Sequence, residues 1–201
     1  FQAERLVSMT VNPNWSHVTN ADEFLAFYER LLGKVRGMPG VVSAAVSGNV
    51  PLAQNMRMTL GLVMEGQKAG DLRKAAAVRL AVAGTDYFET MRMPLLAGRT
   101  FNASDNRKDA PPVAVISARM ARQYFAGGSP VGRRVKLANS EQWITIVGET
   151  GDARIEGLDR EPQETLYLPM GQMPAGTTVV VRTALEPAEL IGSLRRTVYE
   201  I

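Results

Sequence analysis

The sequence predicts an α+β fold with two parts, an outer part built from both ends of the chain and an inserted, more β-rich part between them. Two kinds of apolar spacing support this: alternation typical of strands, and a three-to-four residue period typical of helices. The order of these segments is the third observation, because long helices occur near both ends and strands dominate the middle. The predicted division is residues 1–83 with 174–201 for the outer part and residues 84–173 for the insert.

The first fifty residues predict a strand, a long helix and a second strand. Residues 6–11 alternate in polarity and are expected to form the first strand. Asn20 is expected to cap the helix, and Glu23, three residues later, is placed for a capping box. Residues 41–50 are expected to form the second strand. The apolar stripe of the helix comprises Phe24, Tyr28, Leu31, Val35 and Met38.

The next sixty residues predict a hairpin followed by irregular chain. Residues 58–64 and 76–82 alternate and are expected to pair as an antiparallel hairpin. The dipeptide 85–86 is expected to cap a short helix. Residues 93–101 are interpreted as an apolar connector and residues 102–112 as an exposed loop.

Residues 113–169 predict the body of the inserted part. A strand is followed by a short helix that Ser117 is expected to cap, and a glycine corner at 130–132 turns the chain into further strands. The glycine-rich stretch 148–151 is interpreted as a turn. The predicted strands of this part are 113–116, 135–137, 143–147 and 165–169.

The C-terminal residues predict one strand and one helix. Residues 178–182 are expected to form a strand, since positions 178–181 are all β-branched. Glu186 and Pro187 are expected to begin the helix, since proline suits a first helical turn. Its apolar stripe comprises Leu190, Ile191, Leu194 and Val198.

Composition excludes several classes of function. The 201 residues contain no cysteine, which excludes disulfides, thiol catalysis and cysteine-ligated metal sites. The net charge is only +3 and the basic residues are scattered, so no nucleic-acid partner is expected. No run of 18 apolar residues occurs, so no transmembrane helix is expected in this stretch. Because it begins at Phe1 and ends inside an apolar pattern, the chain is interpreted as a fragment of a longer protein.

Few residues are candidates for chemistry. His17 is the only histidine, and a surface loop position is the favoured interpretation over a catalytic base. The stretch 148–152 lacks the Gly-Lys-Ser/Thr of a phosphate loop, and no Gly-x-Ser-x-Gly is present around Ser117 or elsewhere. No catalytic, cofactor-binding or metal-binding residue is therefore predicted, and no cofactor. A solvated loop with local ion pairs is favoured over a Ca²⁺ site for the acidic group Asp152, Glu156, Asp159, Glu161 and Glu164.

A set of segments in order carries a family resemblance over nearly the whole chain. The block at 87–101, which ends Gly-Arg-Thr-Phe, and the Pro-x-Gly-Arg block at 130–133 are the more specific members. Together the segments resemble the periplasmic core domain of MacB-like and FtsX-like ABC transporter permeases, and in particular the duplicated orphan permease group common in acidobacteria. The remaining segments are 1–9, 27–32, 38–41, 49–52, 113–125, 146–148, 167–169 and 180–183.

The resemblance implies a fold, a location and partners. The outer part would be a discontinuous porter-like subdomain and the insert a Sabre-like one, placed outside the inner membrane of a bacterial cell. Transmembrane helices would flank the fragment, one ending just before Phe1, and the last porter strand would follow Ile201. A cytoplasmic ABC ATPase would drive conformational change for efflux or substrate extrusion. A homodimer or a second permease half, and a periplasmic adaptor, are further implied partners; no catalytic residue is implied.

Two other functions stay open on the sequence alone. The chain is also compatible with a periplasmic ligand-binding or sensory domain that holds a small molecule between its two parts. Such a domain is expected to have a deep, closed pocket there. A hydrolase is the least favoured, because the sequence lacks a nucleophile constellation and offers His17 as its only candidate base.

Overall fold

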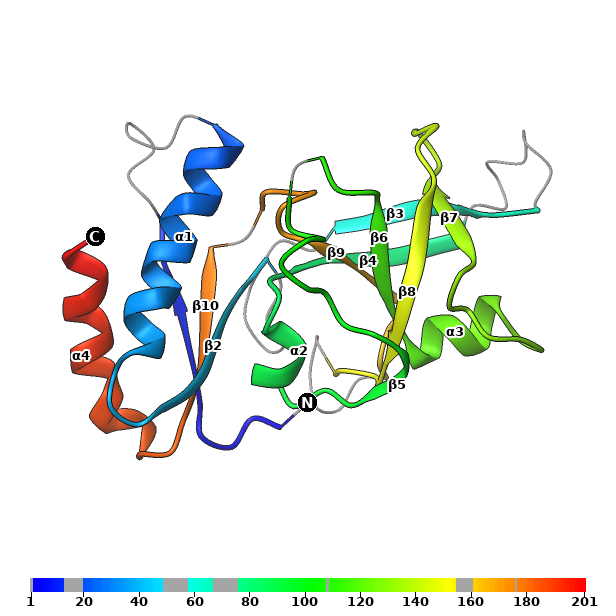
Figure 1. Cartoon of the computed structure of the whole chain (residues 1–201). Coiled ribbons are helices and arrows are strands. Elements are labelled where there is room, and N and C mark those ends of the chain that lie inside the picture. Colours follow the sequence, from blue (N-terminus) through cyan, green and yellow to red (C-terminus); the bar gives the residue numbers. More distant parts are fainter. Residues whose placement is uncertain are drawn as a thin grey trace.

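The computed structural model describes residues 2–12, 20–48, 58–66, 76–107, 109–154, 161–175 and 177–201. Over these ranges the chain forms ten strands and four helices in two lobes that lie side by side (Figure 1). One hydrogen-bonded path, β1-β10-β2-β4-β3-β7-β8-β6-β9, runs through both lobes, and β5 pairs with β8 outside it. The predicted α+β class is confirmed.

The first lobe is a three-stranded antiparallel sheet covered by two long helices. Its strands are β1 (Leu6–Thr10), β10 (Thr178–Thr183) and β2 (Val41–Ser47), with β10 in the centre. Helix α1 (Ala21–Arg36) and helix α4 (Pro187–Tyr199) pack on one face. The strand–helix–strand start and the strand–helix end of the sequence therefore pack together in one lobe.

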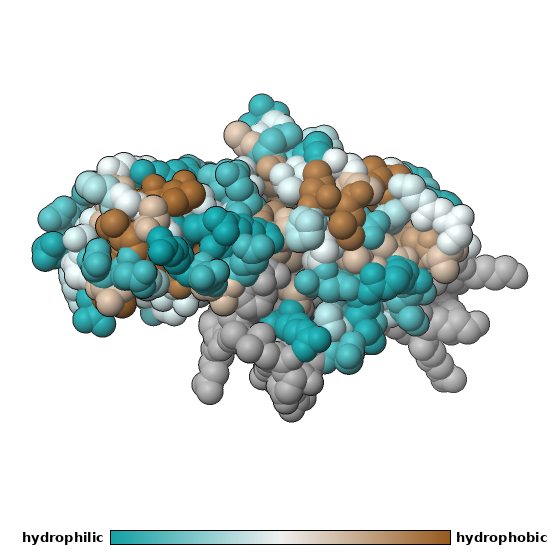
Figure 2. All heavy atoms as spheres, turned by 90° about the horizontal axis from the view of Figure 1, so that it is seen from below, coloured by the Kyte–Doolittle hydropathy of each residue, from teal (hydrophilic) through white to brown (hydrophobic). Residues whose placement is uncertain are grey.

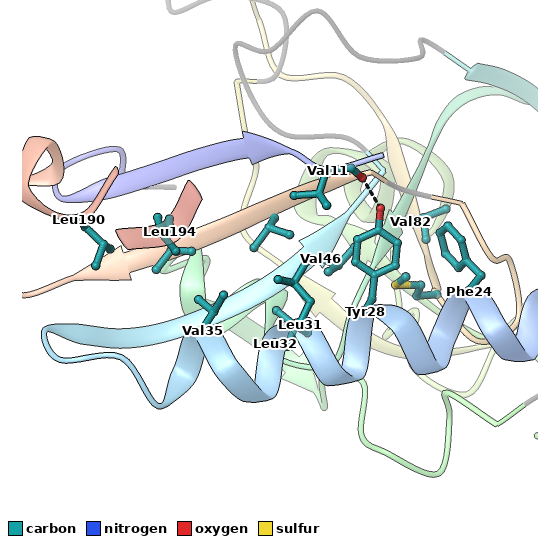
Figure 3. Close-up of a cluster of buried hydrophobic side chains, with 14 residues drawn as sticks. Val11, Phe24, Tyr28, Leu31, Leu32, Val35, Val46, Val82, Leu190 and Leu194 are labelled. Atoms are coloured by element: carbon teal, nitrogen blue, oxygen red, sulfur yellow. Dashed lines mark hydrogen bonds between the residues drawn. The ribbon is translucent and has the colours of Figure 1, made fainter. Parts of the chain in front are cut away.

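The predicted start and buried stripe of α1 are confirmed. The Asn20 side chain accepts a hydrogen bond from the Glu23 N–H at 3.0 Å, which satisfies one of the free donors of the first turn. The Tyr28 hydroxyl donates to the Val11 carbonyl at 2.6 Å, and burial raises the pKa of Tyr28 (Figure 3). Of the predicted stripe, Met38 lies after the helix and is only partly buried.

The central strand of the first lobe, β10, is buried on both faces. Val179 and Val181 of β10 pack with the two long helices, whereas Val180 points to the opposite face. There it meets helix α2 (Tyr87–Thr90). This explains why positions 178–181 of β10 are β-branched without polar alternation, since a strand between two packed layers has no solvent face.

The second lobe is a closed ring of six strands. Pairing runs from β4 (Ala76–Ala83) through β3 (Met58–Met64), β7 (Arg134–Leu137), β8 (Ile144–Thr150), β6 (Val113–Ser117) and β9 (Thr165–Pro169) and returns to β4. The β6–β8 and β4–β9 pairs are parallel. Helix α3 (Ala118–Tyr124) adds Met120 and Ala121 to the core of this lobe. Closure leaves these six strands no free edge within the ring.

Strand pairing affects where the boundary between the outer part and the insert is drawn. The predicted hairpin of β3 and β4 is confirmed, but its side chains belong to the same core cluster as those of β6, β8 and β9. Among the described residues, only Ser47 and Ala83 are register partners between β2 and β4. The division at residues 83 and 84 stays a prediction, and the ring favours grouping 58–83 with the insert.

Two segments differ from their predicted structure. The stretch 148–151 is not a turn, because β8 continues through Gly148 to Thr150. The connector 93–101 contains strand β5 (Leu95–Gly98), which pairs with this same end of β8. Gly98 and Gly148 permit that pairing, since an added Cβ would lie 2.2 Å from the Val147 carbonyl oxygen and 2.1 Å from that of Arg99.

Candidate functional site

The residues singled out for chemistry in the sequence have structural roles where they are described. Ser117 is buried, and its hydroxyl oxygen accepts from the Met120 N–H at 3.3 Å and from the Thr165 N–H at 3.0 Å. It is therefore the predicted helix cap and also fixes the start of β9. Positions 148–150 belong to a strand. His17 lies outside the described residues.

The acidic residues after β8 that are described form ion pairs with α3. Asp152 accepts from the Arg119 N–H at 2.6 Å and pairs with the Arg122 guanidinium at 2.7 Å. Glu164 pairs with Arg119 at 2.9 Å. These ion pairs join the loop to a distant helix. The local ion pairs predicted within the loop stay a prediction, because residues 155–160 lie outside the described residues. Glu156 and Asp159 lie outside the described residues, and among those described no group of three or more His, Cys, Asp or Glu side chains could hold a metal.

An aromatic core joins the two lobes. It contains Tyr87 and Phe88 of α2, Phe101, and Tyr167 of β9, all nearly fully buried. The Phe88 ring lies edge-on to Tyr167, with centroids 5.1 Å apart, and 5.7 Å from Phe101. Val180 of the first lobe packs into the same cluster. Movement of one lobe against the other therefore has to displace α2 or repack these rings.

The crevice at the junction is too small for a ligand. It is lined by residues of α1, β2 and the start of α2, and its open volume is about 10 Å³, room for roughly one water. Arg36 and Asp86 close it with an ion pair of 2.6 Å. A larger groove, of about 600 Å³, lies instead at the far end of the second lobe beside Met64, Tyr124 and Arg133.

Arg182 fixes the N-terminal segment to the junction. This side chain is 3% exposed, and its guanidinium donates to the carbonyls of Gln2, Glu4 and Thr90, each at 2.7 Å. Desolvation by burial, and then the charge of Arg92, lower the pKa of Arg182. The three acceptors come from the segment before β1 and from α2, which lies between the lobes and is called the joint helix below. One side chain therefore connects the N-terminal segment, the joint helix and the central strand of the first lobe.

A second buried charge organises the loop after β5. Asp105 is 5% exposed and accepts from both terminal nitrogens of Arg99, at 2.5 and 3.0 Å, and from the Asn102 N–H at 2.9 Å. Burial disfavours its charged form, but these hydrogen bonds and the Arg99 charge outweigh that effect and lower the pKa of Asp105. The loop 102–112 was predicted to be exposed, and this carboxylate is its buried exception.

The sequence carried only faint signals for these two sites. Arg182 is a single charge at the end of an apolar strand, which suggests a buried, paired arginine but names no partner. For Asp105 the sequence offers no distinguishing sign, because polar loops commonly contain aspartate.

Comparison with known proteins identifies the type of domain. The family model of the MacB-like periplasmic core domain matches residues 2–197. No curated protein sequence matches the chain. Among the described residues, no helix is both long enough and apolar enough to cross a bilayer.

Three solved structures share the fold at 14–21% identity. The periplasmic region of MacB from Actinobacillus actinomycetemcomitans has a TM-score of 0.62 at 14% identity, over 97% of this chain and 82% of that one. A domain of a putative permease from Porphyromonas gingivalis has a TM-score of 0.57 at 21% identity, over 84% and 74%. The extracellular domain of the noncanonic ABC-type transporter YknZ from Gram-positive bacteria has a TM-score of 0.56 at 18% identity, over 94% and 86%.

These structures share the mixed α+β fold of this chain. The match to the family model spans almost the whole chain and is the stronger finding, because the structural likeness at such low identity is one of fold. The chain belongs to the MacB-like periplasmic core domain family, the extracytoplasmic domain of ABC transporter permeases.

Proposed function

We propose that this domain transmits movement, without catalysis of its own, between the membrane part of a permease and the outside of the cell. ATP hydrolysis by a cytoplasmic ABC subunit would supply the energy, and the domain would move for efflux or substrate extrusion. A second permease half or a second copy, and an adaptor outside the membrane, are the partners proposed for the moving surface.

The N-terminal attachment is the observation that carries the proposal. Arg182 ties residues 2 and 4 to Thr90 of the joint helix through three hydrogen bonds. Gln2 adds two more bonds, from its N–H to the Met91 carbonyl and from the Arg92 guanidinium to its side chain. A pull on this segment therefore acts directly on the joint between the lobes rather than on a loose linker.

The rival function of ligand binding between the lobes finds little support among the described residues. A small-molecule site usually encloses several hundred Å³. The junction crevice offers about 10 Å³ and is closed by an ion pair. The buried aromatic core is also packed between the lobes.

A distance measurement in the parent permease tests the proposal. One spin label replaces Arg30 on α1 and another replaces Gln142 in the loop before β8; both positions are exposed, and the chain has no cysteine of its own. With the permease and its ATPase in a bilayer, ATP is expected to change the distance distribution between the two lobes. A pair within the first lobe, Arg30 and Arg195, is the matched control and is expected to stay constant.

The outcome is decided by comparing the two pairs. If ATP changes the Arg30–Gln142 distances and leaves the Arg30–Arg195 distances fixed, the lobes move as units. If ATP leaves both pairs unchanged while it is being hydrolysed, the proposed role is wrong.

A further inference from the structure

The groove at the far end of the second lobe is the largest concave feature found on the described part of the chain. Its open volume of about 600 Å³ is of the size that binding sites usually have. The exposed apolar side chains form no comparable feature, since Figure 2 shows them as separate areas on a largely hydrophilic face. The groove is therefore the better candidate for a second site.

The lining of the groove comes from a helix and two strands. On the helix side it consists of the end of α3 and the loop 125–129, and on the strand side of the end of β3 and the start of β7 (Figure 1). Met64 is only 6% exposed, and Tyr124 and Phe125 pack against the same core cluster. The packed ring therefore holds the apolar part of the lining in place.

Two adjacent arginines line the groove where β7 begins. The Arg134 Nε donates to the Glu65 carboxylate at 2.9 Å, and its guanidinium carbon lies 5.6 Å from the centroid of the Trp143 ring. Arg133 is exposed and, within the described ranges, forms no ion pair. One cation is thus fixed by its neighbours, and the other is available to a ligand.

The charge of this lining favours an anion. Of the described residues that line the groove, Glu65 is the only acid, and Arg134 already neutralises it. Arg133 therefore leaves an excess of positive charge in a concave surface, where it attracts anions most strongly. A guanidinium group matches a carboxylate with two parallel hydrogen bonds, so a carboxylate is a well-suited anion.

The loop after α3 leaves its backbone accessible. Gly127 and Gly128 follow each other, and nothing lies within 4 Å of a Cβ built on either of them. A ligand can therefore approach the peptide groups of the loop closely. The groove is also open to solvent and does not enclose its contents, which suits an extended chain better than a small molecule.

We propose that this groove binds an extended acidic peptide segment, with a carboxylate on Arg133 and an apolar side chain beside Tyr124 and Phe125. Clusters of arginine are a common means of recognising acidic motifs. Glu65 competes with the peptide for Arg134 and thereby lowers the affinity. The inference goes beyond the proposed function, because movement of the lobes requires no ligand at this end of the molecule.

Fluorescence anisotropy with a synthetic peptide tests the site on this 201-residue chain. The probe is rhodamine-labelled Asp-Leu-Asp-Leu-Asp at physiological salt. Arg133→Gln is expected to weaken binding about tenfold, since a charge-assisted hydrogen bond is lost. Glu65→Gln is expected to tighten binding about threefold, because Arg134 is released from its competitor.

Two variants with the same changes of charge elsewhere are the matched controls. Arg195→Gln and Glu189→Gln alter exposed side chains of α4 in the first lobe. Both are expected to leave the affinity unchanged, because salt screens charges that lie far apart. Circular dichroism with a thermal scan verifies that each variant is folded. An unfolded variant would not bind more tightly, so the gain expected for Glu65→Gln keeps the test independent of folding.

Changes to the peptide test its two chemical features. Asn-Leu-Asn-Leu-Asn lacks the side-chain charges, and Asp-Ser-Asp-Ser-Asp lacks the apolar groups. Each is expected to bind about fivefold more weakly than the probe. Equal affinity of the three peptides would contradict the proposed recognition.

Each other outcome overturns the inference. Equal weakening by Arg133→Gln and Arg195→Gln would mean that a basic chain attracts any acidic peptide. Competition by free N-acetylaspartate as strong as that by the unlabelled peptide would mean a small-molecule site. A lack of saturable binding up to about 1 mM peptide would show that the groove is not a peptide site. Because no ATP is involved, peptide binding can hold while the lobe movement fails, and the reverse.

Discussion

Two buried charges, one in each lobe, are held in opposite ways. In the first lobe Arg182 bonds only to backbone carbonyls, those of residues 2, 4 and 90. In the second lobe Asp105 is held by a guanidinium and a backbone N–H. Carbonyl groups do not titrate, whereas a carboxylate loses its charge in acid. The attachment of the N-terminal segment is therefore expected to be independent of pH, and the loop of the second lobe to be weakened at low pH.

Loss of the arginine is expected to have the largest effect. Arg182→Met keeps much of the side-chain volume but leaves three carbonyls without their donor, so unfolding is expected to require about 3 kcal/mol less free energy. Chemical denaturation measures this change, and amide hydrogen exchange is expected to rise at Gln2, Glu4 and Arg5 before the strands open.

A matched control separates the hydrogen bonds from general packing. Leu194 lies in the same lobe, in the core beneath α1 and α4. No described hydrogen bond joins it to residues 2–5, which Arg182 holds. Leu194→Ala is expected to destabilise by about 3 kcal/mol through a cavity, with unchanged exchange at residues 2–5 below the unfolding transition. Similar exchange in both variants would contradict a specific role for Arg182.

Local sequence patterns predict most helices and strands of this chain, but they do not predict the partners of the buried charges Arg182 and Asp105. Asn20 and Ser117 were found as caps because their hydrogen bonds are made to residues only three positions away. Arg182 bonds to residues more than 90 positions away, and no local pattern encodes such partners.

The end of β8 was misinterpreted for a related reason. Gly148 is a turn signal in the sequence, yet its lack of a side chain here allows β5 to approach the strand backbone. Closure of the second lobe likewise depends on the parallel pair of β4 and β9, whose sequence separation is too long for spacing to predict.

The carboxylate of the second lobe gives the next largest effect. Asp105→Asn keeps the shape of the side chain but removes its charge and one acceptor facing Arg99, so the free energy of unfolding is expected to fall by about 2 kcal/mol at neutral pH. Arg99 is half exposed and regains water, which keeps the loss below that of Arg182→Met. Urea denaturation at pH 7 compares the two variants.

Acid sharpens the contrast between the lobes. The pKa of Asp105 is lower in the folded protein than in the unfolded chain. The contribution of its charge to stability is therefore complete above the unfolded pKa of about 3.9 and is lost as the pH falls through the folded pKa. The difference in stability between the original chain and Asp105→Asn is thus expected to shrink below about pH 4. The Arg182→Met difference is expected to stay constant over the same range; a parallel decline of both would refute the distinction.

Removal of the exposed ion pair between Glu65 and Arg134 is expected to have the smallest effect on stability. The hydrogen bond from Arg134 nevertheless lowers the pKa of the Glu65 carboxyl. Both groups are open to solvent, so water replaces the partner when the pair is removed. Glu65→Gln is expected to leave the denaturation midpoint unchanged within error at physiological salt. A clear loss of stability that disappears in high salt would mean that surface charge stabilises the second lobe. Burial would then not explain why Asp105 contributes more to stability than the other acidic residues of this lobe.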